Sequence, residues 1–218
     1  MSATTPLPVT LTGRHVRVEP LSPDHLDDLF AAGGGDDEVW RWQGGPTPHT
    51  PQELGEKLTE LLANGAYVPF AVIHRASGRA VGWTTYMDID AAHERLEIGS
   101  TWYGRAHWRS AVNTETKLLL IGHAFEELGM GRVQLKTDHL NVRSQEAIAR
   151  LGAHREGVLR RHRRRPDGTW RDTVYFSLLA DEWPEAKARL EARVEARVEA
   201  RLEARVEARL EARVEARP

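Results

Sequence analysis

Two consecutive strand–loop–helix units in the middle of the chain constrain its fold more than any other feature. Residues 95–103 (RLEIGSTWY) have the composition of a strand, and residues 114–128 have the periodicity of a helix with one buried face. A second short strand is predicted at residues 133–137, followed by a helix at residues 141–151. Because a helix joins the two strands, the segment predicts at least one crossover within a mixed sheet.

The remainder of the chain up to residue 183 also alternates between strands and helices. Ser22-Pro23 has the residue types of a helix start, and Asp167-Gly168 is a strong signal for a hairpin turn. Further strands are predicted at residues 9–20, 68–74, 80–89, 154–163 and 169–179, and further helices at residues 22–32 and 50–64. This order predicts an α/β (α+β) fold with a mixed, mostly antiparallel twisted sheet flanked by helices.

Composition narrows the class of protein. With 218 residues, of which 40% are hydrophobic, the chain can build one sizeable domain with an ordinary core. A formal net charge of −2 argues against a general nucleic-acid binder. The absence of cysteine excludes disulfides, thiolate nucleophiles and cysteine zinc sites, and no metal is expected. The start of the chain does not resemble a secretory signal, and no apolar run is long enough to span a membrane, so a cytoplasmic protein without a membrane partner is expected.

The last part of the chain is a repeat. From Leu190 the unit Leu/Val-Glu-Ala-Arg occurs seven times, and almost every residue type in it favours a helix. A four-residue period drifts around a helix by roughly 40° per repeat, so the repeat presents no fixed apolar seam. We therefore expect a globular domain at residues 1–184 and an extended helical tail at residues 185–218. The tail is either solvated or a docking or self-association arm.

The first strand–loop–helix unit also suggests a binding site. A strand that leads through a loop into a helix directs free backbone N–H groups and the positive end of the helix dipole to one point. Such a point suits an anion, and a pyrophosphate in particular. Many turns of this kind bind nothing, so the geometry alone is a weak signal.

The second unit adds a more specific pattern. Asn141-x-x-Ser144 is followed by Leu151-Gly152, with the glycine eleven positions after the asparagine. Together with the preceding unit, this segment resembles the GNAT-superfamily N-acetyltransferases, and within them the RimJ/RimL-like type that acetylates ribosomal-protein N-termini. The resemblance spans nearly all of residues 11–183.

The resemblance implies that acetyl-CoA binds as a co-substrate in the gap between two splayed strands, residues 95–103 and 133–137. Two of the loop positions differ from the family, because Ala111 stands where glycine is usual and Asn113 stands where glycine or alanine is usual. Arg109, another position that is often glycine, either compensates by pairing with a phosphate or blocks the site. The expected cofactor-binding residues are Trp108, Arg109, Ser110, Ala111, Val112, Asn113 and Thr114 in the loop, and Asn141, Arg143 and Ser144 in the second unit.

Acetyl transfer also needs a base and an acceptor pocket. Glu97, on the strand where the acceptor enters, is the first choice as the base, with a surface ion pair as the alternative. Ile148 stands where many GNAT enzymes carry a tyrosine that protonates the leaving thiolate. Trp40, Arg41 and Trp42 are expected to line the acceptor pocket, unless they pack against the core.

Five arginines precede the last hairpin turn: Arg160, Arg161, Arg163, Arg164 and Arg165. Because side chains alternate along a strand, these arginines divide between two faces and do not form one patch. A solvated hairpin is the expected role, with an acidic protein or ribosomal RNA as the alternative partner.

The sequence therefore predicts an acetyl-CoA-dependent N-acetyltransferase that acts on a primary amine. The acceptor is a protein N-terminus or a small amine, and a homodimer is compatible with the sequence. The alternative is a GNAT-fold binding or regulatory protein whose acetyl-CoA loop has degraded and which does not turn over.

Overall fold

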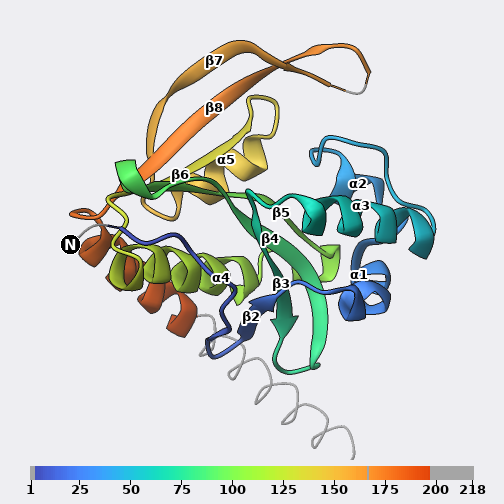
Figure 1. Ribbon diagram of the computed structural model, residues 1–218, viewed down its shortest axis with the longest axis horizontal. Helices are drawn as coiled ribbons and strands as arrows, with labels where there is room; N and C mark the ends of the chain where they lie inside the picture. The colour runs from blue at the N-terminus through green and yellow to red at the C-terminus, as the bar shows by residue number, and fades with distance from the viewer. Residues whose placement is uncertain (1–2, 166, 197–218) are drawn as a thin grey trace, which may run out of the picture.

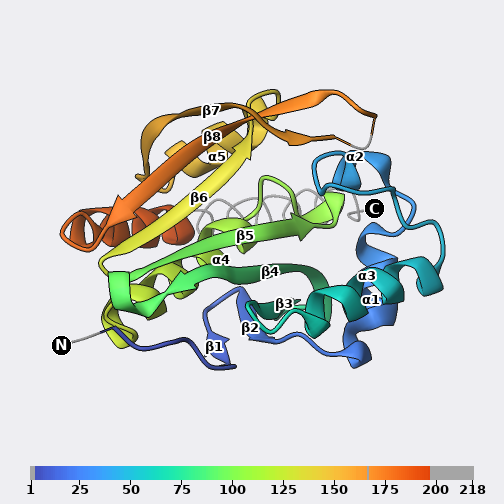
Figure 2. The same cartoon turned by 45° about the horizontal axis from the view of Figure 1, so that its top comes forward.

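A computed structural model describes residues 3–165 and 167–196 of the chain. Within these residues, one sheet contains eight strands in the order β1-β2-β3-β4-β5-β6-β8-β7 (Figures 1 and 2). Every neighbouring pair is antiparallel except β5 and β6, which are parallel. The mixed, mostly antiparallel sheet predicted from the sequence is confirmed.

The element bounds follow the predicted order closely. The strands are β1 Leu11–Thr12, β2 Val16–Pro20, β3 Val68–His74, β4 Arg79–Asp90, β5 Arg95–Tyr103, β6 Arg132–Asp138, β7 His154–Arg164 and β8 Trp170–Leu179. The α-helices are α1 Leu26–Gly33, α2 Asp37–Trp40, α3 Pro51–Ala63, α4 Ala111–Gly122 and α5 Val142–Ala149, with short helical turns η1 Pro23–His25, η2 Ala91–His93, η3 Arg105–His107 and η4 His123–Glu127. Of the helices among the described residues, none combines the length and apolarity that crossing a membrane requires.

Two local expectations differ from the structure. The strand predicted at residues 9–20 is divided into β1 and β2, because the chain reverses at Gly13 and the two short strands pair with each other. The helix predicted to begin at Thr114 begins three residues earlier, where the Ser110 hydroxyl accepts a hydrogen bond from the Val112 N–H.

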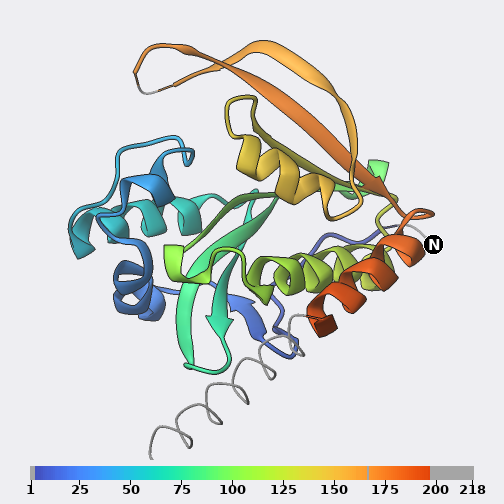
Figure 3. The ribbon, with the colours of Figure 1, turned by 180° about the vertical axis from the view of Figure 1, so that it is seen from behind.

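The sheet separates two hydrophobic cores. Along β3, Phe70 and Val72 belong to one core, while Ala71 and Ile73 belong to the other, as strand alternation requires. Helices α1, α2 and α3 cover the second face, whereas α4, α5 and the C-terminal helix cover the first (Figures 1 and 3). The crossover helix α4 thus lies under the strands that flank the parallel pair.

A buried carboxylate fixes the start of the sheet to α4. Glu115 is 4% exposed and accepts hydrogen bonds from the backbone N–H groups of Arg14, His15 and Val16 at 2.7, 2.6 and 2.8 Å. Three donors replace the water that this carboxylate loses on burial. The contact holds the turn between β1 and β2 against the crossover helix.

The packed body extends beyond the boundary predicted at residue 184. Residues 183–196 are helical and lie along α4 (Figure 3). Trp183, Ala186, Leu190 and Val194 are buried in the same core as α4, and their spacing of three to four residues places them on one helix face. The first two repeat units therefore contribute to the domain, and the predicted tail beyond residue 196 lies outside the described residues.

Leu190 provides a direct test of this packing. Leu190→Ala should lower the free energy of unfolding by about 2–5 kcal/mol, because it removes a fully buried side chain and leaves a cavity. Glu191→Ala, on the exposed face of the same helix, should change the free energy by less than about 0.5 kcal/mol. Urea denaturation measures both, and equal small effects would show that the helix does not form part of the core in solution.

Candidate active site

The strands β5 and β6 separate in the middle of the sheet. They pair only at Arg95 with Arg132, Leu96 with Val133 and Glu97 with Gln134. Beyond Glu97, the edge of β5 that faces β6 has no strand partner among the described residues, while β6 stays paired with β8. Figure 2 shows the two strands diverging from this point. The open edge carries backbone groups that need hydrogen-bond partners.

A bulge in β5 begins where the strands part. Trp83 pairs with Trp102 but Thr85 pairs with Gly99, so β5 has one extra residue, and Ser100 adopts a positive φ of 47°. A Cβ on Gly99 would lie 2.8 Å from the Glu97 carboxylate and 2.6 Å from the Met87 sulfur. Glycine at this position therefore lets the Glu97 side chain fold back against its own strand.

Glu97 is buried at the start of the opening. Its side chain is 2% exposed, and one oxygen, Oε2, lies 2.6 Å from Lys136 Nζ and accepts a hydrogen bond from Gln134 at 2.9 Å. Among the described residues no hydrogen bond is made by the other oxygen, Oε1, which lies beside Gly99. The alternative of a surface ion pair was therefore wrong in its position and partner, because Glu97 is buried and paired with Lys136, while the role of its unbonded oxygen as a base stays a prediction.

Beyond the bulge, Thr101 is held from both sides of the sheet. From α4, Lys117 Nζ donates to the Thr101 hydroxyl at 2.9 Å and to the Thr84 hydroxyl at 3.3 Å. From the loop after α2, Gln43 Nε2 donates to the Thr101 carbonyl at 2.8 Å. The bulge therefore connects a helix on one face with a loop on the other.

Lys117 is an unusual component of this network. It is 4% exposed, and burial lowers the pKa of its amine to about 7, while the charge of Glu97 opposes that shift. The cause is the loss of hydration, which disfavours the charged form of a buried amine. The sequence of α4 predicts an amphipathic helix, in which a lysine is expected on the exposed face. The local sequence therefore gives no sign that Lys117 is buried.

The predicted pyrophosphate loop leads into the N-terminus of α4. The positive φ in this loop falls at Arg109, with a φ of 57°, whereas Ala111 and Asn113 are helical. The expectation that Ala111 and Asn113 occupy positions needing glycine-like backbone was therefore wrong, because the helix begins earlier than predicted. The residues Ala111, Val112, Asn113 and Thr114 form the first turn, whose N–H groups have no partner within an α-helix.

Positive charge gathers beside this helix start. The Arg143 guanidinium, from the first turn of α5, lies 3.6 Å from the centre of the Trp108 ring, and Arg105 lies 6.0 Å from it. Burial lowers the pKa of Arg143, and the charges of Arg105 and Arg109 add to this while Glu38 opposes it. Arg105 is paired with Asp36, so Arg109 and Arg143 are the cations left to meet an anion at α4.

The second predicted unit behaves as a helix start. Asn141 is the N-cap of α5, and its side chain accepts a hydrogen bond from the Ser144 N–H at 3.1 Å. This capping role accounts for the asparagine and for the three-residue spacing. Ile148 is 7% exposed and packs in the core, so no acid is present at that position.

The tryptophans of the predicted acceptor pocket have different environments. Trp40 is 3% exposed, packs against Trp83 and Trp102, and donates its indole N–H to the Gly33 carbonyl. Core packing therefore accounts for Trp40. Arg41 and Trp42 lie nearer the surface and stack on each other at 5.1 Å.

The structure brings the loop residues and Arg143 together, and it places Glu97 at the start of the opening. Four further residues around the opening were missed from the sequence: Gln43, Thr101, Lys117 and Lys136. For Lys136 the sequence did offer a signal, because strand alternation puts Gln134 and Lys136 on one face of the strand next to Glu97. The local sequence gave no comparable signal for the other three.

Lys117 makes stability depend on pH in a specific direction. Its pKa is about 7 in the folded chain and roughly 10.4 when unfolded, so between these values the unfolded chain binds more protons at this site. The free energy of unfolding of the natural chain should therefore rise with pH across that window. Lys117→Met should remove this rise, which amounts to a few kcal/mol.

Urea unfolding at about pH 6.5 and about pH 9.5 measures the effect. Lys57→Met removes a partly exposed lysine over the Trp40 ring and should retain the natural pH dependence. The same slope in the natural chain and in Lys117→Met would contradict a buried, largely neutral Lys117.

Comparison with known proteins agrees with this geometry. Residues 15–154 match the family described as the acetyltransferase (GNAT) domain. A GCN5-related N-acetyltransferase from Brucella melitensis is 34% identical, with a TM-score of 0.84 over 88% of this chain and 87% of that one. Mycobacterium smegmatis RimJ in complex with CoA-disulfide has the same fold at 22% identity, with a TM-score of 0.72 over 85% and 95% of the two chains.

A curated relative is the Bacillus subtilis protein named "Putative ribosomal N-acetyltransferase YdaF". It is 31% identical over 115 residues, which make up 50% of this chain and 59% of YdaF. The match to YdaF thus spans less than two thirds of that protein. The family match covers most of the chain, and the Brucella structure is similar over nearly all of it. The chain therefore belongs to the GNAT acetyltransferase family.

Proposed function

We propose that the chain transfers an acetyl group directly from acetyl-CoA to the α-amino group of a protein or peptide. The observation that carries this proposal is the Glu97 carboxylate at the point where β5 and β6 part. Its Oε2 is occupied by Lys136 and Gln134, and its Oε1 lies beside the open edge of β5 without a hydrogen bond from the described residues. An amine entering the opening would meet this oxygen.

Acetyl-CoA would lie along the open edge of β5. Its pyrophosphate would bind the N–H groups of the first turn of α4, with Arg109 and Arg143 as the charged partners. Its pantetheine amides would pair with the backbone of β5 beyond Glu97, which has no strand partner on that side. The thioester would then reach the bulge at Gly99 and Ser100.

Transfer needs a neutral amine and a place for developing charge. The amine nitrogen attacks the thioester carbon, an N–C bond forms, and the C–S bond breaks with its electron pair on the CoA sulfur. The amine proton passes to Glu97 Oε1, directly or through one water. A backbone N–H on the open edge of β5 donates to the carbonyl oxygen as negative charge develops on it.

An α-amino group fits this arrangement better than a lysine. It titrates near roughly 8, so a useful fraction is neutral at physiological pH, whereas a lysine side chain titrates near roughly 10.4. Glu97 Oε2 is held by Lys136 and Gln134, so Oε1 is the oxygen left to meet the amine proton. The name of YdaF, a ribosomal N-acetyltransferase, supports a protein acceptor, and a small amine remains the second acceptor class.

Arg109→Gly tests the cofactor site. Glycine relieves the positive φ but removes the cation, so the dissociation constant of acetyl-CoA should rise roughly tenfold, while stability is unchanged or increased. Arg109→Lys keeps the charge and should lose less affinity. Isothermal titration calorimetry measures both, and tighter binding by Arg109→Gly would show that the arginine obstructs the site.

Glu97→Gln tests the base. Turnover should fall by about 10²–10⁴-fold, because the amide cannot accept the amine proton, while acetyl-CoA affinity stays the same. Asp88→Asn is the matched control, since this exposed carboxylate also bonds Gln134 but lies at the surface. Unchanged turnover in Glu97→Gln, measured by mass spectrometry of acetylated peptide, would remove Glu97 from the mechanism.

The rival function, a binding protein with a degraded cofactor loop, predicts a different result. A ligand present at 100 times its dissociation constant stabilises the folded state by ~2.7 kcal/mol. A rise in melting temperature that corresponds to this free energy supports an acetyl-CoA-dependent enzyme. An unchanged melting temperature at millimolar acetyl-CoA supports the binding protein. Ala111 and Asn113 are helical, so the lack of glycine at these positions does not argue for a degraded loop. Arg109 is the loop position at which the replacement of glycine affects the backbone, because it has a positive φ.

A further inference from the structure

A continuous row of polar side chains leads away from Glu97 across the second face of the sheet. Lys136, the ion-pair partner of Glu97, lies 5.8 Å from the centre of the Tyr175 ring on β8. The ring of His162, on β7, lies 6.0 Å from the Tyr175 ring, and His162 bonds the Thr173 hydroxyl at 3.0 Å. Arg171 Nε donates to the same hydroxyl at 3.0 Å, so the row ends in a guanidinium.

The row carries more positive than negative charge. Glu97 is balanced by Lys136, and Asp138 is balanced by Arg165 at 2.7 Å. Arg171 and Arg163 are partners across the β7–β8 ladder, so their side chains share one face. Among the described residues, neither arginine has a carboxylate within ion-pair distance, although Asp138 is near enough to Arg171 to oppose the lowering of its pKa.

The row of contacts connects Arg171 to Glu97 through Lys136, Tyr175, His162 and Thr173. Burial is the main cause that lowers the pKa of Arg171, with Arg163 acting in the same direction, while the charges of Asp138 and, to a smaller extent, Glu97 oppose it. A partly buried guanidinium without a paired anion has lost hydration that an anionic ligand would replace.

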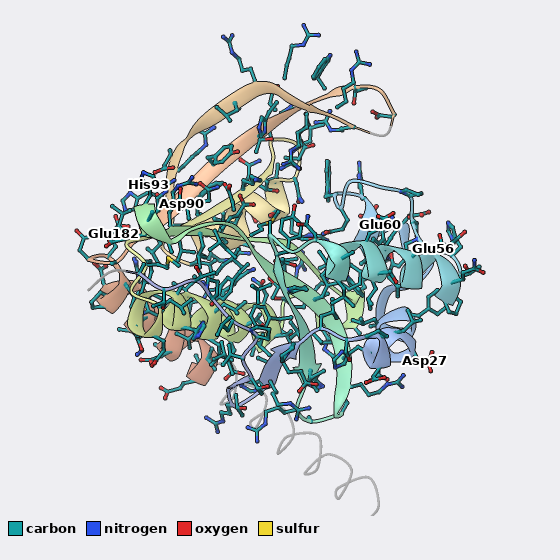
Figure 4. All side chains as sticks on the ribbon, in the orientation of Figure 1. Asp27, Glu56, Glu60, Asp90, His93 and Glu182 are labelled. Atoms are coloured by element: carbon teal, nitrogen blue, oxygen red, sulfur yellow. The ribbon has the colours of Figure 1, made fainter. Side chains whose placement is uncertain are left out.

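The position of the β7–β8 hairpin allows an acceptor to reach this row. In Figures 1 and 3, the outer end of the hairpin lies on the side of the molecule that carries α2, over the opening of the sheet. Figure 4 places Asp27, Glu56 and Glu60 on the outer surface of α1 and α3, and Asp90 and Glu182 at the opposite end of the sheet. The carboxylates at the outer end of the hairpin already have partners: Asp167 accepts hydrogen bonds from Thr169, and Asp172 accepts one from the Arg161 N–H.

We propose that Arg171, assisted by Arg163, binds a carboxylate carried by the acceptor, so that the enzyme selects amines with a nearby acidic group. This inference rests on the proposed function of the site. Guanidinium binds carboxylate through two parallel hydrogen bonds, which gives direction as well as attraction. The carboxylate comes from an acidic side chain of a peptide.

The strand register sets the spacing. Glu97 is in register with Gln134, and Gln134 pairs with Ser177 on β8. Six positions of β8 lead from Ser177 to Arg171, a distance of roughly 20 Å along the strand. An extended peptide covers that distance in about six residues, so an acidic side chain at about the fifth to seventh residue would reach Arg171 when the N-terminal amine lies at Glu97.

The test compares acceptors on the full-length chain. Peptides that differ only in glutamate or glutamine at positions five to seven are assayed for kcat/KM with saturating acetyl-CoA. The natural chain should prefer the acidic acceptor by about tenfold or more, which corresponds to ~1.4 kcal/mol.

Variants locate the effect. Arg171→Met should abolish the preference by raising KM for acidic acceptors, while kcat for glutamine-containing acceptors stays unchanged, and Arg171→Lys should retain part of it. Arg155→Met is the control, because Arg155 pairs with the core residue Phe176 and so faces the other side of the same hairpin. This variant should keep the full preference.

Three results would overturn the inference. Acetylation of acidic and neutral acceptors at equal rates by the natural chain would overturn it while leaving the proposed function intact. A preference that persists in Arg171→Met would do the same. Acetyl-CoA binding without acetylation of any acceptor would overturn the proposed function and the inference together.

Discussion

The separation of β5 from β6 after Glu97 is the constraint on which the rest of the structure depends. A sheet that opens in its middle leaves backbone N–H and C=O groups without partners, and such groups are costly to bury unless something else bonds them. The eight-stranded sheet meets this requirement by keeping β6 paired with β8 and exposing only the edge of β5. Helices α4 and α5 both begin at the open end, so their unbonded N–H groups and the unpaired edge of β5 surround one region. A ligand with alternating amides and a charged end satisfies both sets of groups.

The opening is kept in shape by buried polar contacts, because apolar packing alone would let β5 move back towards β6. Lys117 holds Thr101 from α4, and Gln43 holds the same residue from the loop after α2. A polar network of this kind is expensive to bury and specifies one arrangement only when its members are satisfied. The loop that carries Gln43 also carries Trp42, so α4 and the loop predicted to line the acceptor pocket are joined through a single strand residue, Thr101. This coupling would transmit a shift of the loop directly to the edge of β5.

The order of helices and strands could be predicted because it depends on local periodicity and turn residues, and the structure confirms it. Contacts between distant residues carried no local signal. Lys117 reads as one more charged position on a helix, yet its partners lie 33 and 16 residues earlier in the chain. The error at Ala111 and Asn113 came from a helix start misplaced by three residues, since Ser110 is a stronger N-cap than the local pattern suggested.

The domain boundary at residue 184 was placed too early because the drift of a four-residue period matters only over several repeats. Over the first two repeats, Leu190 and Val194 still share one helix face with Ala186.

Although the net charge of the chain is −2, four arginines near the opening and on the β7–β8 hairpin have no carboxylate within ion-pair distance among the described residues. Arg109 and Arg143 stand at the start of α4, where the backbone already favours an anion, and Arg163 and Arg171 stand on the hairpin where no helix dipole assists. The two groups differ in burial, since Arg171 is partly buried within a strand row and Arg109 is exposed in a loop. Arg109, in a loop, can adjust its position to a flexible phosphate. Arg171 is held by Thr173 and lies opposite Arg163, so it can bind only an anion that reaches this fixed position. This difference in burial fits a reaction in which acetyl-CoA is common to the whole family, whereas the acceptor amine differs between its members.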